Sequence, residues 1–299
     1  MLAANSKFIY FHIPYSKLRS LFFFPFFIFY FPLFNIFVFY DMICRICDNN
    51  SEHFADAEIL FKYKIKYYKC PACGFVQTEE PYWLEEAYTE AINDSDIGLL
   101  KRNADLVTPT RNVLKIFFKS DAEFIDFGAG YGVFVRMMRD AGYKFSWSDK
   151  YCENVYAKGF EANGDTVYEA LTAYEVFEHL PNPSDGIKEM LKYSDSIMFS
   201  TFLIPSGNPK PGDWWYYATD HGQHVSLYSE KSLGVLASKF GLNFYTNGKN
   251  IHLLTKKKIS GFLFKLITAP YADRFFAPLS KKKSLLDSDY LLVLKKAGK

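Results

Sequence analysis

The stretch FIDFGAGYGVF, residues 124–134, places three glycines at alternate positions directly after a short apolar run that contains an acid. Glycine has no Cβ atom and adopts positive φ angles readily, so a glycine-rich turn lets a ligand approach the backbone closely. Gly128, Gly130 and Gly132 follow the spacing G-x-G-x-G, whereas the dinucleotide fingerprint G-x-G-x-x-G needs glycine in place of Val133. The G-K-[ST] ending of a nucleoside-triphosphate loop is also absent from this stretch. Both phosphate-binding interpretations are therefore disfavoured.

Two acids near the loop indicate the charge of its ligand. The carboxylate of Asp126 precedes the glycines and would repel a pyrophosphate, but it suits a ligand that carries positive charge. S-adenosylmethionine (SAM) carries a sulfonium and an ammonium group. Asp149 ends the apolar run KFSWSD, where a carboxylate can accept hydrogen bonds from both ribose hydroxyls. The loop, its spacing and the second acid together predict a SAM site.

Apolar runs and helical patterns alternate from residue 122 onward. The runs that predict strands are 122–127, 144–149, 171–176 and 197–202. The patterns that predict helices are 132–142, 153–164, 184–194 and 231–241. This alternation predicts an α/β fold with a doubly wound, mostly parallel sheet, whose ligands bind outside the carboxyl ends of the strands.

Four of the five cysteines form two C-x-x-C pairs, Cys44 with Cys47 and Cys70 with Cys73. The 22 residues between the pairs include FKYKIKYYK, whose alternation of apolar and basic residues predicts a half-exposed strand. Two such pairs can bring four thiolates to tetrahedral geometry around one zinc ion, which would stabilise a small hairpin domain. We therefore predict a structural zinc ribbon and a reducing compartment. Cys152 has no predicted role.

The N-terminal extension, residues 1–41, has three possible interpretations. Its stretch 20–40 has no charge and is long enough to cross a bilayer, so it would be a signal anchor if genuine. Alternatively translation starts at Met42 and the extension is upstream sequence, or the extension is a cleaved targeting peptide. We expect a cytoplasmic protein with the later start and a membrane-associated one with a genuine span.

Three separated segments resemble class I SAM-dependent methyltransferases over roughly residues 111–257: IDFGAGYG, the acid of SDK, and AYEVFEHLPNP. The resemblance implies a seven-stranded sheet whose last strand is antiparallel, for which 287–296 is the candidate. It also implies a set of cofactor-binding residues: Asp126, Phe127, Gly128, Ala129, Gly130 and Gly132 at the loop, Asp149 on the ribose, and Tyr174 and Glu175 lining the pocket.

The first 80 residues carry a second resemblance. CPACGFVQTEEPYW is similar to the zinc-binding N-terminal domain of nucleotide-sugar C-methyltransferases, but only about forty residues follow Lys257, too few for the C-terminal domain of those enzymes. The implied acceptor is a carbohydrate-related or other small hydroxylated molecule. We predict four parts: the extension 1–41, a zinc ribbon 42–80, a helical linker 81–118 and a methyltransferase domain 119–299.

Candidate catalytic residues lie in EVFEHLPNP and in DWWYYATDHGQHVSLYS. On one helical turn Glu175, Glu178 and His179 would face the same way. With His224 they would form a site for a divalent cation in addition to the zinc ion. This set of residues resembles the metal site of quinone-biosynthesis O-methyltransferases and of small-RNA 3′-terminal 2′-O-methyltransferases. The alternatives are that His221 or His224 is a metal-free general base, or that E-H-L-P only orients the turn after its strand.

The net charge of +2 disfavours nucleic acid as a partner, and a small-molecule or glycan acceptor suits it better. A metal-dependent 2′-O-methyltransferase of RNA ends and a non-catalytic cofactor-binding or interaction module stay as alternatives. The apolar and basic segment 259–283 predicts a helix that covers the sheet or, alternatively, contacts a membrane surface. The sequence gives no oligomeric state.

Overall fold

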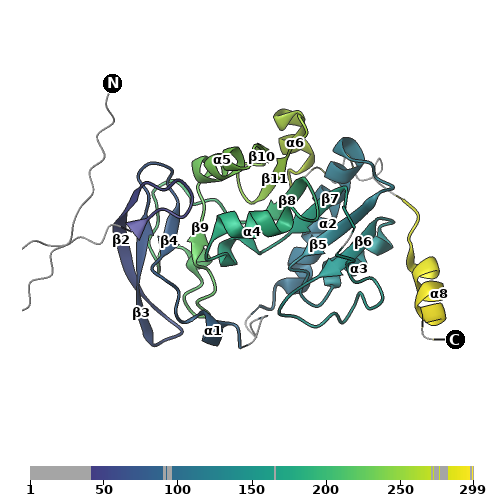
Figure 1. Ribbon diagram of the computed structural model, residues 1–299, viewed down its shortest axis with the longest axis horizontal. Coiled ribbons are helices and arrows are strands. Elements are labelled where there is room, and N and C mark those ends of the chain that lie inside the picture. Colours follow the sequence, from purple (N-terminus) through teal and green to yellow (C-terminus); the bar gives the residue numbers. More distant parts are fainter. Residues whose placement is uncertain are drawn as a thin grey trace, which may run out of the picture. The chain divides into compact units, whose positions relative to one another are not determined.

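The computed structural model describes residues 42–299, with gaps at 90–91, 93–95, 165, 271, 273–275, 277–281, 297 and 299. The extension 1–41, and with it the predicted stretch 20–40, lies outside the described residues. Within the described part, no helix combines the length and the hydropathy that a membrane span requires. Figure 1 shows the arrangement of the elements.

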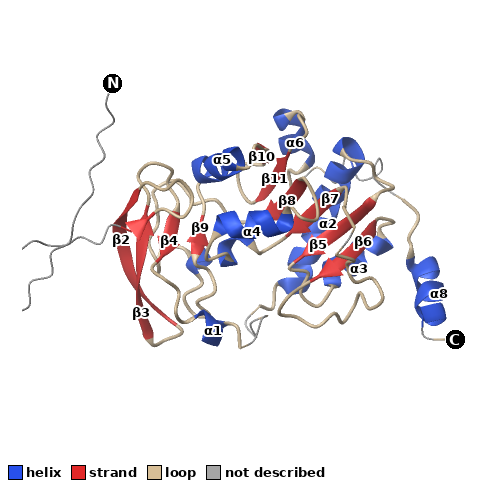
Figure 2. Ribbon diagram, in the orientation of Figure 1, coloured by secondary structure: helices blue, strands red, loops and turns tan. Residues whose placement is uncertain are grey.

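A six-stranded sheet with the order β10-β11-β8-β7-β5-β6 forms the centre of the structure (Figure 2). Its strands are β5 (Glu123–Phe127), β6 (Lys144–Ser148), β7 (Ala170–Ala173), β8 (Ser196–Ser200), β10 (Asn243–Thr246) and β11 (Ile251–Thr255). β6, β5, β7 and β8 are parallel, and β11 is antiparallel to both of its neighbours. The strand order reverses between β5 and β7, which is where ligands bind in doubly wound sheets.

Two details of the predicted sheet are wrong. Seven strands were expected, but the described residues contain six, and a single parallel bridge from Trp147 to Glu161 occupies the position beside β6. Residues 153–164, expected to be helical, supply that bridge. The antiparallel strand is β11, whereas 287–296 belongs to helix α8 (Leu286–Lys296). Acids in its first turn and lysines in its last turn match the helix dipole, which favours the helix.

Helices cover both faces of the sheet. α4 (Pro183–Met190) and α5 (Glu230–Lys239) share a core with one face. The other face packs against three helices: α2 (Leu99–Phe117), α3 (Val133–Asp140) and α6 (Gly261–Ile267). Neighbouring strand residues alternate between the two cores, as Phe124 and Ile125 do, because successive side chains of a strand point to opposite faces.

The cysteine-bearing region forms a second, antiparallel sheet with the order β1-β2-β3-β4-β9. Its strands are β1 (Met42–Ile43), β2 (Asn50–Ile59), β3 (Tyr63–Lys69), β4 (Val76–Thr78) and β9 (Ser226–Leu227). β9 comes from the α/β region, and Cys44, Cys70 and Cys73 belong to the same buried core as α4 and α5. The short helix α1 (Leu84–Ala87) lies between β4 and α2 in the chain. The ribbon and the α/β region therefore share a sheet and a core.

Candidate functional site

A cavity of about 1270 Å³ opens at the carboxyl ends of the parallel strands. Eight of the nine predicted cofactor residues line it, and Gly132 does not. Residues of α1 and α2 form another wall, and the segment 215–224 forms a third. The cavity thus collects residues from both sequence motifs and from the segment predicted to be a linker.

The glycine loop after β5 needs its glycines for two physical reasons. Gly128 has a φ of +70°, and a Cβ atom there would lie 2.6 Å from Cγ2 of Val176. Gly132 has a φ of +85° and begins α3, where a Cβ atom would lie 3.0 Å from Oδ1 of Asn154. Side chains at these positions would clash and strain the backbone. The loop can therefore present bare backbone to a ligand.

The two acids predicted beside the cofactor lie on either side of this loop. Thr172 donates a 2.6 Å hydrogen bond to Asp126, and burial raises the pKa of that carboxyl to about 7. Asp149 accepts hydrogen bonds from the backbone N–H groups of Gly130 (2.8 Å) and Tyr151 (2.7 Å), among others. Those bonds fix the Asp149 carboxylate against the loop and orient it along the cavity wall. Both acids are placed where a cationic ligand carrying a ribose could contact them.

Glu175 takes a different position from the one expected. Its φ of +54° is left-handed, and the 3-10 helix η1 (Phe177–His179) begins only after it. Glu175, Glu178 and His179 therefore do not share a regular helical turn. The backbone N–H of Glu175 donates to Oγ of Ser200 (2.8 Å), and the Ser200 hydroxyl donates to Oε1 of Glu175 (2.5 Å). The guanidinium of Arg102 lies 3.6 Å from Oε2 of Glu175, so an ion pair holds this carboxylate in the cavity wall.

Glu178, His179 and His224 form a cluster in which one potential ligand atom from each lies within 4.8 Å of the others. The imidazole Nδ1 of His224 lies 2.6 Å from the backbone oxygen of Tyr216 in the 3-10 helix η2 (Trp215–Tyr217). Nδ1 of His179 lies 3.0 Å from the hydroxyl of Tyr88. These contacts leave Nε2 of both rings as the nitrogen that can bind a metal ion.

Burial sets the charges in this cluster. Glu178 is fully buried, and neither of its carboxylate oxygens has a hydrogen-bond partner of good geometry among the described residues. Burial and the nearby Glu175 raise the pKa of Glu178 to about 8, and the neighbouring hydroxyls of Tyr216 and Thr201 offset only part of that rise. Burial also lowers the pKa of His224 to about 3 and that of His179 well below its usual value, so both imidazoles are neutral.

This donor set fits a divalent cation. A carboxylate and two neutral imidazoles are ligands that such ions accept, and a buried carboxylate without a partner is costly unless an ion or a proton compensates it. His221 lines the cavity with its ring centroid 5.2 Å from that of His224, but it lies outside the three-residue cluster. It is left as a candidate base.

The family model described as a methyltransferase domain matches residues 101–247. The match supports a methyltransferase. It begins inside α2, so the family pattern reaches into the segment predicted as a linker, and it includes the glycine loop, Glu178, His179 and His224. No curated protein matches the sequence.

Solved structures similar to the chain include TnmH and two methyltransferases. TnmH shares 14% identity over 59% of this chain and 62% of its own, with a TM-score of 0.42. The plantazolicin methyltransferase BpumL, solved with S-adenosylhomocysteine (SAH), shares 12% sequence identity over 58% of this chain and 94% of its own, with a TM-score of 0.39. Magnesium protoporphyrin IX methyltransferase from Synechocystis PCC 6803, solved with bound SAM, shares 12% sequence identity over 58% of this chain and 92% of its own, with a TM-score of 0.36. The chain thus spans less than two thirds of TnmH, and likenesses this distant assign no substrate.

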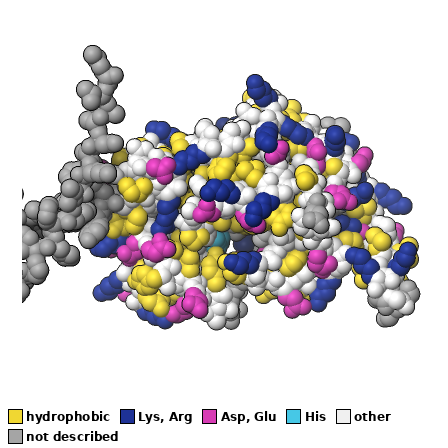
Figure 3. Space-filling model, viewed as in Figure 1, with side chains coloured by type: hydrophobic (Ala, Val, Ile, Leu, Met, Phe, Trp, Pro, Cys, Tyr) yellow, Lys and Arg dark blue, Asp and Glu magenta, His cyan; other side chains and the backbone are white. Residues whose placement is uncertain are grey.

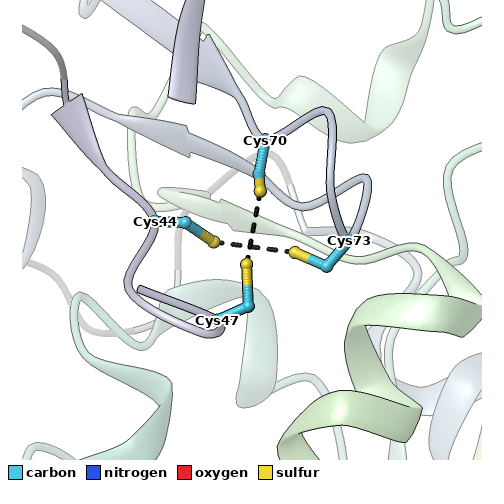
Figure 4. A group of neighbouring side chains, drawn as sticks. All are labelled: Cys44, Cys47, Cys70 and Cys73. Atoms are coloured by element: carbon cyan, nitrogen blue, oxygen red, sulfur yellow. Dashed lines mark hydrogen bonds between the residues drawn. The ribbon is translucent and has the colours of Figure 1, made fainter. Parts of the chain in front are cut away.

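The four ribbon cysteines converge beside the α/β region. Their sulfur atoms point toward a common centre (Figure 4) and all lie within 4.8 Å of one another. The sulfurs of Cys44 and Cys73 are 3.6 Å apart, and those of Cys47 and Cys70 are 3.4 Å apart. A tetrahedral zinc ion with Zn–S bonds of about 2.3 Å needs sulfurs roughly 3.8 Å apart. The hydrogen bond between Cys44 and Cys73 lowers the pKa of Cys44 to about 5 and raises that of Cys73, so Cys44 is the first of the two to form the thiolate that binds metal.

Hydrogen bonds join the ribbon to the glutamate–histidine cluster. Gln77 in β4 pairs through its backbone with Ser226 in β9, two residues after His224. Its buried side chain donates to the backbone oxygen of Ile43 (2.8 Å) and accepts from the backbone N–H of Arg45 (2.9 Å). The N–H of Val225 donates to the backbone oxygen of Glu178 (2.9 Å). The first cysteine pair is thus linked to both halves of the cluster.

Several residues at the site lie outside every motif recognised in the sequence. Arg102 and Tyr88 come from the predicted linker and line the cavity. Thr110 in α2 lies 2.6 Å from the hydroxyl of Tyr174, and Ser200 fixes Glu175. No pattern in the sequence marks these residues, because each is defined by its neighbour across the fold. The start of the family match within α2 is the one signal that includes Arg102 and Thr110.

Proposed function

We propose that the chain is a SAM-dependent O-methyltransferase of a carbohydrate-related or other small hydroxylated acceptor, with a divalent cation at Glu178, His179 and His224. One observation carries the proposal: His179 and His224 line the same cavity as the glycine loop. A cofactor held at the loop and an acceptor held at the cluster would then face each other. We also propose that the four cysteines bind one structural zinc ion.

SAM, when bound, supplies an electrophilic methyl group. The chain's own contribution is binding and alignment: Asp126 and Asp149 would hold the cofactor's cationic and ribose groups, and the bare loop would allow its close approach. A cation at the cluster would lower the pKa of an acceptor hydroxyl that it binds. His221 is placed to take the proton, because its ring lies beside His224 and lines the cavity. Alignment of this kind accounts for a large share of catalysis in two-reactant transfers.

The alternatives have less support. Basic and acidic side chains are interspersed with apolar ones on the face shown in Figure 3, unlike the continuous basic surface of an RNA-binding protein. A metal-free base at His221 or His224 would leave the buried Glu178 carboxyl with no role. A non-catalytic module has no need for acids arranged around a ligand loop. Cytoplasmic location and membrane contact through 20–40 or 259–283 stay predictions.

Native mass spectrometry of the full chain with SAM tests the proposal, because metal ions and cofactor are counted on the same molecule. We expect one zinc ion, one SAM and one further divalent cation, and SAH formation with an extract of the cells that make the protein. Glu178→Gln should lose only the further cation and the turnover. A chain that binds no SAM would contradict the methyltransferase proposal, and unchanged turnover in Glu178→Gln would favour the metal-free base.

A further inference from the structure

The charge of the cavity wall restricts the acceptor. Seven acidic residues line the cavity: Glu85, Asp96, Asp126, Asp149, Glu175, Glu189 and Asp220. The described lining contains two basic side chains, Arg102 and Lys150. The three histidines are not counted among the charges, because His179 and His224 would bind the metal ion as neutral imidazoles and His221 must be neutral to accept a proton.

Neither basic side chain is free to clamp a phosphate in the interior. Arg102 donates to both carboxylate oxygens of Asp96, at 2.7 and 2.6 Å, and also lies 3.6 Å from Glu175. Its fork of donors, which is the usual partner of a phosphate, is therefore already occupied by carboxylates. Lys150 is exposed at the rim, with its Nζ 5.2 Å from the ring centroid of Tyr151.

Two of the acids that line the cavity are exposed to solvent. Glu85 of α1 and Asp220 are exposed, and Asp220 directly precedes His221. Lys192 pairs with Glu189 (2.5 Å), and a bound SAM and a divalent cation would offset most of the remaining negative charge. A phosphate or diphosphate on the acceptor would thus meet carboxylates and no unpaired basic side chain among the described residues of the cavity interior.

Aromatic side chains supply the remaining acceptor contacts. Trp215 lines the cavity with 69% of its surface exposed, and Tyr88 stacks on Tyr151 with ring centroids 5.1 Å apart. An exposed indole in a cavity wall suits packing against the apolar face of a sugar ring or another flat polyol. The wall therefore offers stacking and hydrogen-bond acceptors, and it offers no anion clamp among its described residues.

We infer that the acceptor is a phosphate-free hydroxylated molecule, uncharged or cationic, such as a sugar ring that is not linked to a nucleotide, and that Trp215 packs against it. This inference rests on the proposed function. It excludes nucleotide-linked sugars and RNA ends, both of which bring phosphates to the reacting hydroxyl.

A charge-separated extract tests the acceptor class. The small-molecule and glycan pool of the producing cells is passed over an anion exchanger at pH 7.5, and SAH formation by the full chain is measured with each fraction, with SAM binding measured separately. We expect turnover with the unbound fraction, unchanged by phosphatase treatment. Turnover confined to the bound fraction and abolished by phosphatase overturns this inference but leaves the methyltransferase proposal standing. Absence of SAM binding, or of turnover with any fraction, overturns both.

Trp215→Ala tests the stacking contact, with Tyr82→Ala as a matched control, since Tyr82 is also an exposed aromatic residue (62%) but is not part of the cavity lining. With the acceptor from the active fraction, we expect Trp215→Ala to raise its KM about tenfold while the Kd of SAM is unchanged, and Tyr82→Ala to alter neither. Equal KM values in the two variants would remove Trp215 from the acceptor site.

Discussion

The four cysteines and the Glu178–His179–His224 cluster are both groups of converging metal-binding side chains, but they differ in environment. Cys44, Cys70 and Cys73 are closed into a core, and two neighbouring pairs supply all four donors. The cluster joins residues 45 positions apart, and its histidines face a cavity. A closed set of four donors is typical of a structural metal, whereas an incomplete set facing a cavity leaves coordination positions for a substrate. The difference predicts that one site maintains the fold and the other performs chemistry.

Cys73→Ala should have the largest effect on stability. Loss of one thiolate opens the tetrahedron and leaves three sulfurs, two of them buried, without their metal, so we expect loss of the zinc and a fall of at least about 10 °C in Tm, a change of several kcal/mol. Cys152→Ala is the control, since Cys152 lies outside the cluster. Metal content and thermal unfolding measure both variants. Retention of zinc with a normal Tm in Cys73→Ala would refute the structural role.

Glu178→Gln should separate chemistry from stability at the other cluster. Glutamine has the same shape but binds a cation poorly, so we expect turnover to fall at least about 100-fold. The pKa of about 8 means that metal-free Glu178 takes up a proton on folding at pH 7, so Glu178→Gln should raise, and not lower, the unfolding free energy of the metal-free chain. The control is Glu189→Gln, also in the cavity lining but ion-paired to Lys192 (2.5 Å). A strongly destabilised Glu178→Gln would make the carboxyl structural instead.

Asp126 sharpens the comparison, because it is a buried carboxyl that has a hydrogen-bond partner. Its pKa is raised from 3.8 to about 7, so the folded state holds a proton that the unfolded chain releases. Stability without SAM should therefore fall as the pH rises from about 4 to about 7, and stay lower above that range. Asp126→Asn should be more stable than the native chain by on the order of 4 kcal/mol at pH 8, and by little near pH 4.

Chemical denaturation at both pH values measures this effect. Glu123→Gln, which removes an exposed carboxylate on the same strand, serves as the control. The same difference at pH 4 and pH 8 in Asp126→Asn would mean that burial does not raise this pKa.

Gln77→Met tests whether the two clusters are coupled. Methionine keeps the volume but loses the hydrogen bonds to Ile43 and Arg45, which should cost about 1–3 kcal/mol. Because β4 positions β9, we also expect cobalt titrated into the zinc-loaded protein to bind Glu178, His179 and His224 several-fold more weakly. Asn49→Ala is the control, since Asn49 bonds to Cys47 in the same knuckle. Unchanged cobalt affinity in Gln77→Met would show the two sites to be independent.

The glycine loop and the doubly wound alternation could be predicted because each depends on neighbouring residues. A positive φ needs glycine at positions such as Gly128, and strand and helix periods are local patterns. The predicted last strand failed for the opposite reason. Asp289 pairs with Arg136 (2.9 Å) and Arg139 (2.6 Å), and these partners, about 150 residues away, anchor the segment as a helix. A local pattern cannot contain such partners.

By itself, the sequence determined the four-cysteine spacing, the glycine loop with its two acids, and the class of fold. Only the tertiary structure decided which acid joins the histidines: Glu178 converges with His179 and His224, while the left-handed backbone at Glu175 turns that residue toward Ser200 and Arg102. The physical reason is distance along the chain. Donors within one turn are fixed by local geometry, whereas His224 reaches Glu178 only because β9 pairs with β4 and its neighbour Val225 bonds to the Glu178 backbone.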